Sequence, residues 1–266
     1  MEKSSSHAGG AALVTGASSG IGIEIARLLA EQGYDLVLTG RDTGALARVA
    51  DEIRADHSVQ VATVTKDLSQ PGAVQELVAD IAAQEIAVEI LVNNAGLGVT
   101  GPLAETDADA TAQMIVVNIG ALTELTQRLL PGMLERRRGR ILNVGSVVGY
   151  QPGGPGMAAY FATKSYVLAL SRALSRELSG SGVTVTTVSP GPVKTAFGER
   201  SGMNATRIER LVKPMAAKTV ARAAVRGLLA GRRTVLPGIL AKVLAFAGEL
   251  PPRWIALEVN RFMFSK

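Results

Sequence analysis

The stretch Thr15-Gly16-Ala17-Ser18-Ser19-Gly20-Ile21-Gly22 decides the fold that this sequence predicts. It follows an apolar β-like run, Ala11–Thr15, and opens a segment with helical periodicity, so it is a turn between a strand and a helix. Gly16 allows a tight exit from the strand, Gly20 lets the backbone approach a pyrophosphate, and Gly22 lets the helix lie close to the sheet. Backbone N–H groups at the start of the helix then face the anion. The alternative is an ordinary glycine turn.

Apolar runs of the same kind recur along the chain, between segments with helical periodicity. They are typical of parallel strands buried on both faces of a sheet. The predicted strands are Ala11–Thr15, Asp35–Gly40, Val59–Thr65, Ile90–Asn93, Gly139–Val144 and Val183–Ser189, with Thr234-Val235-Leu236-Pro237 as a candidate seventh. Gly33 is expected to end the first helix, and Ser69, followed by Pro71, to cap the helix that runs to about Gln84. This alternation predicts a single-domain Rossmann-type α/β fold, a doubly wound parallel sheet of about seven strands flanked by helices, with ligands at the carboxyl ends of the strands.

The composition favours one domain with a large core. Of the 266 residues 47% are apolar, and no linker or repeat divides the chain. We expect a flexible polar leader over residues 1–10, a catalytic domain over 11–237 with a substrate flap at about 196–214, and an apolar helical extension of that domain over 238–266.

Cysteine is absent and there are two histidines, His7 and His57, which argues against thiolate and histidine-rich metal sites, so no metal is expected. The leader lacks the hydrophobic region of a signal peptide, and no apolar run approaches the roughly 18 residues of a membrane span. The expected location is therefore the cytoplasm.

The net charge of +5 is modest, and its one dense cluster is Arg136-Arg137-Arg138 with Arg140. We expect a solvated helix C-terminus, where cations complement the helix dipole. The alternative is an anion or nucleic-acid patch. Aromatic residues that could stack on bases do not interleave with the cluster, so no nucleic-acid partner is expected.

The end of the second predicted strand, Leu38-Thr39-Gly40-Arg41-Asp42, discriminates between two dinucleotides. Enzymes that use NAD usually present an acid there to the ribose, whereas those that use NADP present a cation to the 2′-phosphate. Gly40 occupies the acid position, Arg41 follows it, and Ser18 can add a hydroxyl donor. The sequence therefore predicts NADPH/NADP+. The alternative is that Arg41 only ends the strand while Asp42 caps the next helix.

A second motif, Tyr160-Phe161-Ala162-Thr163-Lys164, places a phenol and an amine four residues apart. On a helix this spacing puts both groups on the same face. By itself such a pair is more often surface decoration. Together with the glycine-rich turn, it indicates nicotinamide-dependent carbonyl chemistry.

From about Ala11 to Thr195 the chain resembles the short-chain dehydrogenase/reductase family. The resemblance implies a catalytic tetrad of Asn118, Ser146, Tyr160 and Lys164. It implies that the cofactor is bound by Gly16, Ser18, Ser19, Gly20, Ile21, Gly22, Arg41, Asp67, Leu68, Asn94, Ala95, Gly96, Tyr160, Lys164, Pro190, Gly191, Val193 and Thr195. In this family the segment matched by Asn93-Asn94-Ala95-Gly96 also steadies the central strand.

Two further segments resemble a bacterial branch of ketoreductases that has no single substrate, namely Leu129-Leu130-Pro131-Gly132-Met133 and the run 159–168. The loop from Gly149 to Gly156 is about one residue longer than the commonest family pattern. This loop is expected to line the substrate side, so the departure bears on the substrate more than on the chemistry.

The tetrad suits carbonyl reduction chemically. Hydride transfer to a ketone leaves negative charge on oxygen, which needs a proton donor. The phenol of Tyr160 has an ordinary pKa near 10, and the Lys164 ammonium is expected to lower it by favouring phenolate. Ser146 would give its hydroxyl to the carbonyl oxygen, and Asn118 is a candidate for holding a water that joins Lys164 to solvent. Singly, Ser146 could be a turn residue and Asn118 a helix kink.

The flap is expected to have an apolar inner face and a basic outer one. The inner residues would be Phe197, Met203 and Ile208, and the outer ones Arg200, Arg207 and Arg210. Solvation explains these arginines; contact with an acidic or phosphorylated carrier is the alternative. The tail is aromatic, with Phe246, Trp254, Phe262 and Phe264. A helix from about Pro252 would carry an apolar stripe of Ile255, Val259, Phe262 and Met263, expected to pack in the core or against another subunit. A substrate lid and shallow membrane attachment are the alternatives.

These features predict an NADP-dependent oxidoreductase that reduces a small-molecule ketone or aldehyde, medium-sized and apolar, to an alcohol. The rival is a non-catalytic NADP(H)-sensing or scaffolding protein of the same fold. Helices from about Asp107 to Leu130 and from Met157 to Ser179 are paired in resembling proteins, so we expect a homodimer or homotetramer. The small or apolar residues expected there are Ala121, Leu125, Ala169 and Ala173.

Overall fold

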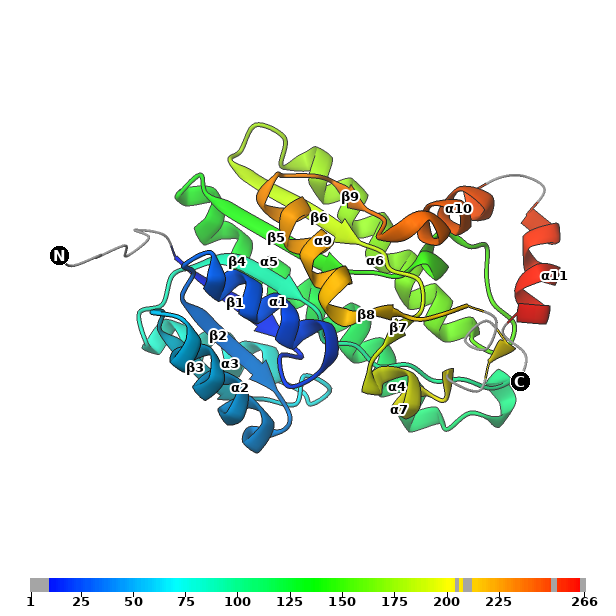
Figure 1. Ribbon diagram of the computed structural model, residues 1–266, viewed down its shortest axis with the longest axis horizontal. Helices are drawn as coiled ribbons and strands as arrows, with labels where there is room; N and C mark the ends of the chain where they lie inside the picture. The colour runs from blue at the N-terminus through cyan, green and yellow to red at the C-terminus, as the bar shows by residue number, and fades with distance from the viewer. Residues whose placement is uncertain (1–9, 204–205, 208–211, 250–252, 264–266) are drawn as a thin grey trace.

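The computed structural model describes residues 10–203, 206–207, 212–249 and 253–263. A parallel sheet forms the middle layer, with helices on both faces (Figure 1). Its seven strands follow the order β3-β2-β1-β4-β5-β6-β9, and every neighbouring pair is parallel. The strands are β1 (Ala11–Thr15), β2 (Leu36–Gly40), β3 (Val61–Thr65), β4 (Val88–Asn93), β5 (Gly139–Val144), β6 (Val183–Val188) and β9 (Thr234–Val235). The predicted fold class is confirmed, and the candidate seventh strand forms over Thr234–Val235 and lies beside β6.

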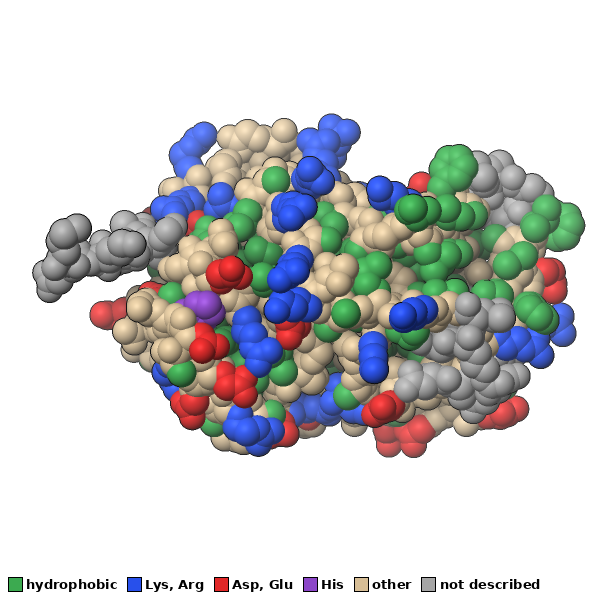
Figure 2. All heavy atoms as spheres, in the orientation of Figure 1, with side chains coloured by type: hydrophobic (Ala, Val, Ile, Leu, Met, Phe, Trp, Pro, Cys, Tyr) green, Lys and Arg blue, Asp and Glu red, His purple; other side chains and the backbone are tan. Residues whose placement is uncertain are grey.

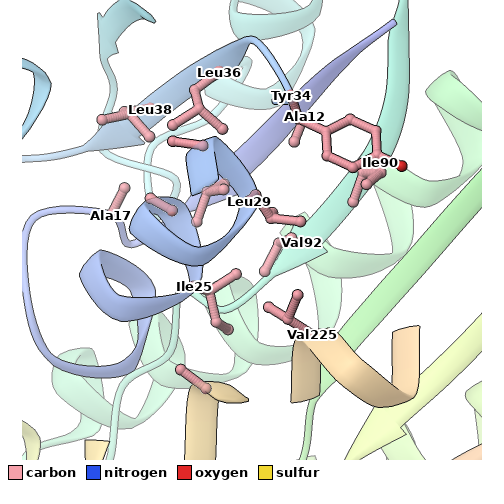
Figure 3. Close-up of a cluster of buried hydrophobic side chains, with 14 of the residues drawn as sticks. Ala12, Ala17, Ile25, Leu29, Tyr34, Leu36, Leu38, Ile90, Val92 and Val225 are labelled. Atoms are coloured by element: carbon pink, nitrogen blue, oxygen red, sulfur yellow. The ribbon is translucent and has the colours of Figure 1, made fainter. Parts of the chain in front are cut away.

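Alternating side chains of the buried strands build a core on each side of the sheet. In β2, Leu36 and Leu38 join one core and Val37 joins the other. The helices over the first core are α1 (Gly20–Glu31), α2 (Thr43–Asp56) and α9 (Ala217–Leu229), and those over the second are α3 (Ala73–Ala83), α5 (Leu122–Glu135) and α6 (Ala158–Glu177). Figure 3 shows Ile25 and Leu29 of α1 packed within the first core. Both faces are covered, which is why the strands read as nearly continuous apolar runs.

The predicted helix caps are partly right. Gly33 follows α1 with a φ of 82°, and Asp42 caps α2 by accepting the Ala45 N–H at 2.8 Å. The Ser69 prediction is wrong, because α3 begins at Ala73 after a left-handed Gly72. The Ser69 hydroxyl instead donates to Asp67 at 2.8 Å, so it stabilises the turn that precedes the helix.

The helix predicted over 107–130 is not uniform. It consists of α4 (Ala108–Ile115), a π-helical turn η2 (Val116–Ala121) and α5. A π-turn inserts an extra residue into the helix and is often found at functional sites. Asn118 lies inside η2, so the change of helical phase falls at a predicted site residue.

Two of the four residues expected at a subunit contact face the protein's own core. Ala121 and Leu125 are buried beneath the sheet, while Ala169 and Ala173 on α6 are exposed. Ala121 and Leu125 therefore cannot belong to a solvent-facing patch, which corrects that expectation. Ala169 and Ala173 are exposed and remain candidates for such a patch.

The arginine cluster near residue 138 is structural rather than merely solvated. Arg138 and Arg140 each lie 3.0 Å from a carboxylate oxygen of Glu89, whose side chain is 3% exposed. Arg136 donates to the Val88 carbonyl at 3.0 Å. The expected solvated helix C-terminus is confirmed for Arg136, Arg137 and Arg138, which are exposed at the end of α5, and the contacts of the cluster also hold the beginning of β4.

Short elements frame the carboxyl end of the sheet. They are the 3-10 turns η1 (Leu103–Glu105) and η3 (Val147–Tyr150), the helix α7 (Ala196–Ser201), and the strands β7 (Val193–Lys194) and β8 (Met215–Ala216). β7 and β8 pair with each other and so join the two ends of the flap. The tail forms α10 (Gly238–Glu249) and α11 (Arg253–Met263). The leader residues 1–9, with His7, and Ile208, Arg210, Pro252 and Phe264 lie outside the described residues.

Candidate active site

A cavity of about 600 Å³ lies at the carboxyl ends of the central strands. Nearly all the predicted cofactor residues line it, together with Ser146. The predicted members are Gly16, Ser18, Ser19, Gly20, Ile21, Arg41, Asp67, Leu68, Asn94, Ala95, Gly96, Tyr160, Lys164, Pro190, Gly191, Val193 and Thr195. Gly22 and Asn118 do not line the cavity. They contact residues that do, Gly16 and Leu97. Two motifs more than 130 residues apart in the sequence thus share one cavity.

The glycine-rich turn is held in place by the end of β4. The Asn94 side chain donates to the carbonyls of Thr15 at 2.9 Å and Gly16 at 3.2 Å. In return, the Thr15 hydroxyl accepts the backbone N–H groups of Asn94 and Ala95, at 3.0 and 2.9 Å. These reciprocal bonds fix the turn, so its free N–H groups are preorganised for an anion.

Gly22 is required by close packing. A Cβ at this position would overlap the Gly16 carbonyl oxygen and lie 2.6 Å from the Asn94 side-chain nitrogen. Only glycine therefore lets the first turn of α1 lie so close to the strand that precedes it. Ser19, the N-cap residue of α1, makes no side-chain capping bond, which leaves its hydroxyl facing the cavity.

At the end of β2, Arg41 and Asp42 both line the cavity. The Asp42 carboxylate also caps α2, as the alternative interpretation expects, while Arg41 is available to a ligand in the cavity. A Cβ at Gly40 would lie 3.2 Å from the Ser18 hydroxyl, so a larger residue would crowd this corner. Burial raises the pKa of Asp67, but hydrogen bonds from Ser69 and the nearby Arg41 charge outweigh it and hold that pKa below its ordinary value. Gly40, Arg41 and Ser18 therefore line the same part of the cavity.

The other half of the cavity holds the phenol, the amine and the serine. Ser146 follows β5 and begins η3, and its hydroxyl accepts the Val148 N–H at 3.3 Å. Tyr160 and Lys164 lie in the first two turns of α6, and the Lys164 nitrogen is 5.8 Å from the centre of the Tyr160 ring. Lys164 also donates to the Val144 carbonyl at 3.0 Å. The structure brings these three predicted residues together.

Burial changes the ionisation of both groups. It raises the pKa of Tyr160 well above its ordinary value, although a hydrogen bond with Ser146 partly lowers it. Burial also lowers the pKa of Lys164 to about 8. In this dry environment Tyr160 is an O–H donor at neutral pH, and Lys164 still carries its charge. The expected lowering of the Tyr160 pKa by Lys164 is not seen, because the hydrogen bond with Ser146 is what opposes the effect of burial.

Asn118 is buried and its side chain is fully engaged with protein groups. It accepts the Leu97 N–H at 2.8 Å and donates to the Leu97 carbonyl at 2.9 Å and to the Thr163 hydroxyl at 3.1 Å. A Cβ at Gly96 would lie 3.3 Å from the Asn118 oxygen and 3.8 Å from the Lys164 nitrogen, so the two side chains are neighbours. Asn118 therefore joins the loop after β4 to the helix that carries Lys164.

A buried polar network below the cavity supports this arrangement. Asn93 on β4 donates to Asn143 on β5 at 2.9 Å and to Thr126 on α5 at 3.1 Å. Asn143 in turn donates to Ser171 on α6 at 2.8 Å. The central strands are thereby tied to the helix of Tyr160 and Lys164, which is the steadying role that the resemblance implied for Asn93.

Sequence reasoning did not find the apolar residues on the substrate side. Leu97, Val148 and Met157 form a cluster with Tyr160 and with the flap residues, and all three line the cavity. They come from three separate loops, and no periodicity identifies them in advance. The predicted inward direction of Phe197 and Met203 is confirmed, and the Phe197 ring centre lies 6.1 Å from that of Tyr160.

The flap arginines are not simply solvated. Arg200 lines the cavity and donates to the Ser19 hydroxyl at 3.3 Å, so the flap reaches the cofactor loop. Arg207 lies over the Phe262 ring of α11, 4.4 Å from its centre. Arg200 is exposed, as expected, and Arg207 is half-buried, but each also makes a contact that the expectation did not include. Their sequence surroundings carry no signal for either contact, because each partner is distant in the chain.

The comparisons with known proteins agree with this geometry. The family model described as short chain dehydrogenase matches residues 10–205. An uncharacterized oxidoreductase of Staphylococcus saprophyticus is 40% identical over 184 residues, which cover 69% of this chain and 78% of that protein.

Two solved structures are similar over nearly the whole chain. A short-chain dehydrogenase from Sphingobium yanoikuyae in complex with NADPH has a TM-score of 0.80 and 35% identity, covering 90% of this chain and 92% of that one. A short-chain dehydrogenase/reductase from Burkholderia phymatum in complex with NAD has a TM-score of 0.81 and 28% identity, covering 97% of each. With its doubly wound sheet and its Ser146, Tyr160 and Lys164 around one cavity, this chain belongs to the short-chain dehydrogenase/reductase family of oxidoreductases.

Proposed function

We propose that this protein reduces a ketone or aldehyde to an alcohol with NADPH. The observation that carries the proposal is that Tyr160, Ser146 and Lys164 share a cavity with the glycine-rich turn and Arg41. The Gly22 cradle and the open corner at Gly40 fit a dinucleotide, and Arg41 with Ser18 fits a 2′-phosphate. Bound NADPH would supply a hydride to the carbonyl carbon.

The chain's own residues would complete the reduction. Ser146 donates a hydrogen bond to the carbonyl oxygen and orients it. As negative charge develops on that oxygen, Tyr160 transfers its phenolic proton to it, and the O–H bond of the alcohol forms. The Lys164 ammonium stabilises the resulting phenolate, which takes a new proton from solvent. In the direction of alcohol oxidation the same groups act in reverse.

The lining supports an apolar substrate of medium size. Leu97, Val148, Met157, Phe197 and Met203 surround the Tyr160 side of the cavity, and none of them offers a charge to a substrate. An apolar wall of this kind favours a ketone with hydrocarbon on both sides of its carbonyl. Small hydroxy acids and sugars would leave polar groups without partners there.

The decisive experiment is Tyr160→Phe, tested for NADPH binding and for turnover with a panel of ketones and aldehydes. We expect binding to be retained and turnover to fall by about a hundredfold or more, because general acid catalysis typically contributes that much. Unchanged turnover would remove the assignment of Tyr160. A wild-type protein that binds NADPH yet turns over none of the panel would favour the rival, a non-catalytic sensor or scaffold.

We also propose that the protein is a homodimer or homotetramer. Exposed apolar residues lie on the helices that resembling proteins pair, among them Ile115, Val116 and Tyr166. An isologous contact between copies would cover such a surface. Light scattering at micromolar concentration should show at least a dimer, with Val116→Asp shifting it toward monomer. A monomeric wild-type protein would overturn this proposal.

A further inference from the structure

The two tail helices expose their apolar residues instead of burying them. On α10, Ile239 is 80% and Phe246 68% exposed, and on α11, Trp254 is 66% and Phe262 58% exposed. Figure 2 shows hydrophobic side chains gathered on the right of the molecule, over the region of α10 and α11. We define these helices' exposed large hydrophobic residues as the tail patch: Ile239, Leu240, Val243, Phe246, Trp254, Ile255, Leu257, Val259 and Phe262. In the predicted stripe Ile255, Val259 and Phe262 are exposed and Met263 is half-buried, so the stripe does not pack in the chain's own core, which leaves another subunit, a lid or a membrane as what it contacts.

The orientation of these helices is the reverse of that in an ordinary surface helix. The buried residue on α11 is Asn260, 6% exposed, whose side chain donates to the Gly153 carbonyl at 2.7 Å. The buried residues of α10 are small, namely Ala241, Ala245 and Gly248. Amphipathic helices normally place the large apolar face against the core. Here polar and small residues hold the helices to the domain, and most of the large apolar side chains are exposed, although Leu257 reaches the Gly153 loop and Phe262 contacts Arg207 of the flap.

The distribution of aromatic residues makes the same point. The chain has five phenylalanines and one tryptophan. Phe161 and Phe197 belong to the cluster around the substrate side of the cavity. The other three phenylalanines and the tryptophan all lie in the tail. Large aromatic side chains lose most by exposure to water, so a tail that concentrates them is suited to an apolar surface outside the protein.

The charges of the tail favour one kind of surface. Residues 238–266 carry four lysines and arginines against two glutamates. Glu249 is paired with Arg172 at 2.6 Å, and Glu258 faces Arg261 at 3.7 Å, whereas Lys242 is exposed beside the patch. Two copies of this tail have the same net positive charge, which works against a contact between them. Anionic lipid headgroups would complement them.

We propose that the tail patch docks the protein on an anionic lipid surface, with α10 and α11 lying in the interface. The helices have 12 and 11 residues, about half of what a membrane span needs. Among the described residues no helix is long and apolar enough to cross a membrane. With the cytoplasmic location that the sequence favours, the surface would be the inner leaflet, where anionic lipids attract basic segments.

Docking through the tail patch would bring the cavity close to the lipid surface. This part of the inference rests on the proposed function. α11 is bonded through Asn260 to the loop at Gly153, and its Phe262 lies under Arg207 of the flap. The same two segments lead to Met157 and Thr206, which line the cavity. The substrate entrance therefore lies beside the tail patch, and an apolar ketone could enter from lipid without crossing water.

The first test is flotation of the full chain with vesicles of phosphatidylcholine alone and of phosphatidylcholine with phosphatidylglycerol. We expect binding to the anionic vesicles and much weaker binding to the neutral ones. The double variant Ile239→Ser/Phe246→Ser should bind at least about tenfold more weakly, since two large apolar side chains leave the lipid. Leu134→Ser, an exposed leucine at the other end of the sheet, is the matched control and should bind as the wild type does.

The second measurement uses Trp254, the only tryptophan in the chain. Anionic vesicles should shift its emission to the blue, and brominated lipid should quench it. Absence of both effects would overturn the proposal. The proposal would also be overturned if the emission were blue-shifted without vesicles and the protein self-associated, with both effects lost in Ile239→Ser/Phe246→Ser. The tail patch would then be covered by a second copy of the chain. A shift produced by NADPH and ketone without lipid would identify a lid instead.

The two proposals fail in different ways. Reduction of a water-soluble ketone in the absence of vesicles should be the same in Ile239→Ser/Phe246→Ser as in the wild type. A wild-type protein that binds vesicles but reduces no ketone would overturn the proposed function and leave the docking in place. A protein that reduces ketones but never binds vesicles would do the opposite.

Discussion

Arg200 of the flap and Ser19 of the glycine-rich turn lie 3.3 Å apart, from the guanidinium nitrogen to the hydroxyl oxygen. They are separated by 181 positions in the chain, and their contact joins the flap to the first turn of α1. Under the proposed function, this is where the dinucleotide phosphates meet the helix N-terminus. The flap thus carries a cation that can hold the cofactor.

We expect Arg200→Ala to raise the KM for NADPH by about tenfold, because a charge-assisted contact with phosphate is lost. The value of kcat should change much less, because Arg200 is remote from the proton donor. Steady-state kinetics with varied NADPH would measure both. Arg222→Ala, an exposed arginine of α9 outside the cavity lining, is the control. A change in the ketone KM alone would show that Arg200 only shapes the flap.

Arg41 is expected to set the choice of cofactor. Arg41→Ala should weaken NADPH binding at least tenfold while leaving NADH nearly unchanged, since contacts with a charged phosphate are worth roughly 1.5–3 kcal/mol. Titration of each dinucleotide by fluorescence would test this. Equal losses for both would mean that Arg41 has a structural role.

Lys164 should make the reduction rate depend on pH. Burial lowers its pKa to about 8, so the ammonium is present at pH 7 and is lost as the pH rises through that value. The phenolate of Tyr160 then loses its stabilising charge, and kcat with saturating NADPH should fall above about pH 8. Lys164→Arg keeps its charge in this range. The residual activity of that variant should not fall above about pH 8. If it falls as in the wild type, the pH dependence arises from another group.

Glu89 gives a prediction about stability. Removing both of its partners, in Arg138→Ala/Arg140→Ala, leaves a buried carboxylate unpaired and should cost about 3 kcal/mol of unfolding free energy. Glu89→Gln should cost less, since both arginines reach solvent. Urea unfolding would measure each. Arg128→Ala, which breaks an exposed pair with Glu124, should cost less than about 1 kcal/mol. If Glu89→Gln lowered the unfolding free energy more than Arg138→Ala/Arg140→Ala, the result would contradict the burial of this charge.

The sequence was sufficient for the sheet and for the centre of the site, for physical reasons. Strands buried on both faces leave continuous apolar runs, and the first turn of α1 needs glycine at position 22 because it packs against the nearby Gly16 carbonyl. The carboxyl ends of neighbouring parallel strands meet at one edge, so Ser146 and the glycine-rich turn had to converge there. Local chemistry and topology decided these features together.

Other features depended on contacts that no local pattern records. Asn118, in the π-turn, is bonded to Leu97 and Thr163, which are distant in sequence. The residues next to Arg200 in the sequence do not distinguish it from a solvated arginine. Its hydrogen bond with Ser19 does, and Ser19 is 181 positions away. The spacing of the apolar residues in α11 predicts a stripe along one side of the helix. This spacing does not show whether that side faces the protein. Asn260 settled that orientation.

The pairing of β7 with β8 limits what a change of flap length costs. Val193 lies opposite Met215 and Lys194 opposite Ala216, so the ends of the flap are fastened to each other. Lengthening a loop whose ends are already joined is inexpensive, with a doubling of its length costing only about 0.6 kcal/mol. Insertions between these strands should therefore be tolerated by the sheet, provided that they keep the contacts of Phe197 with Tyr160 and of Arg200 with Ser19.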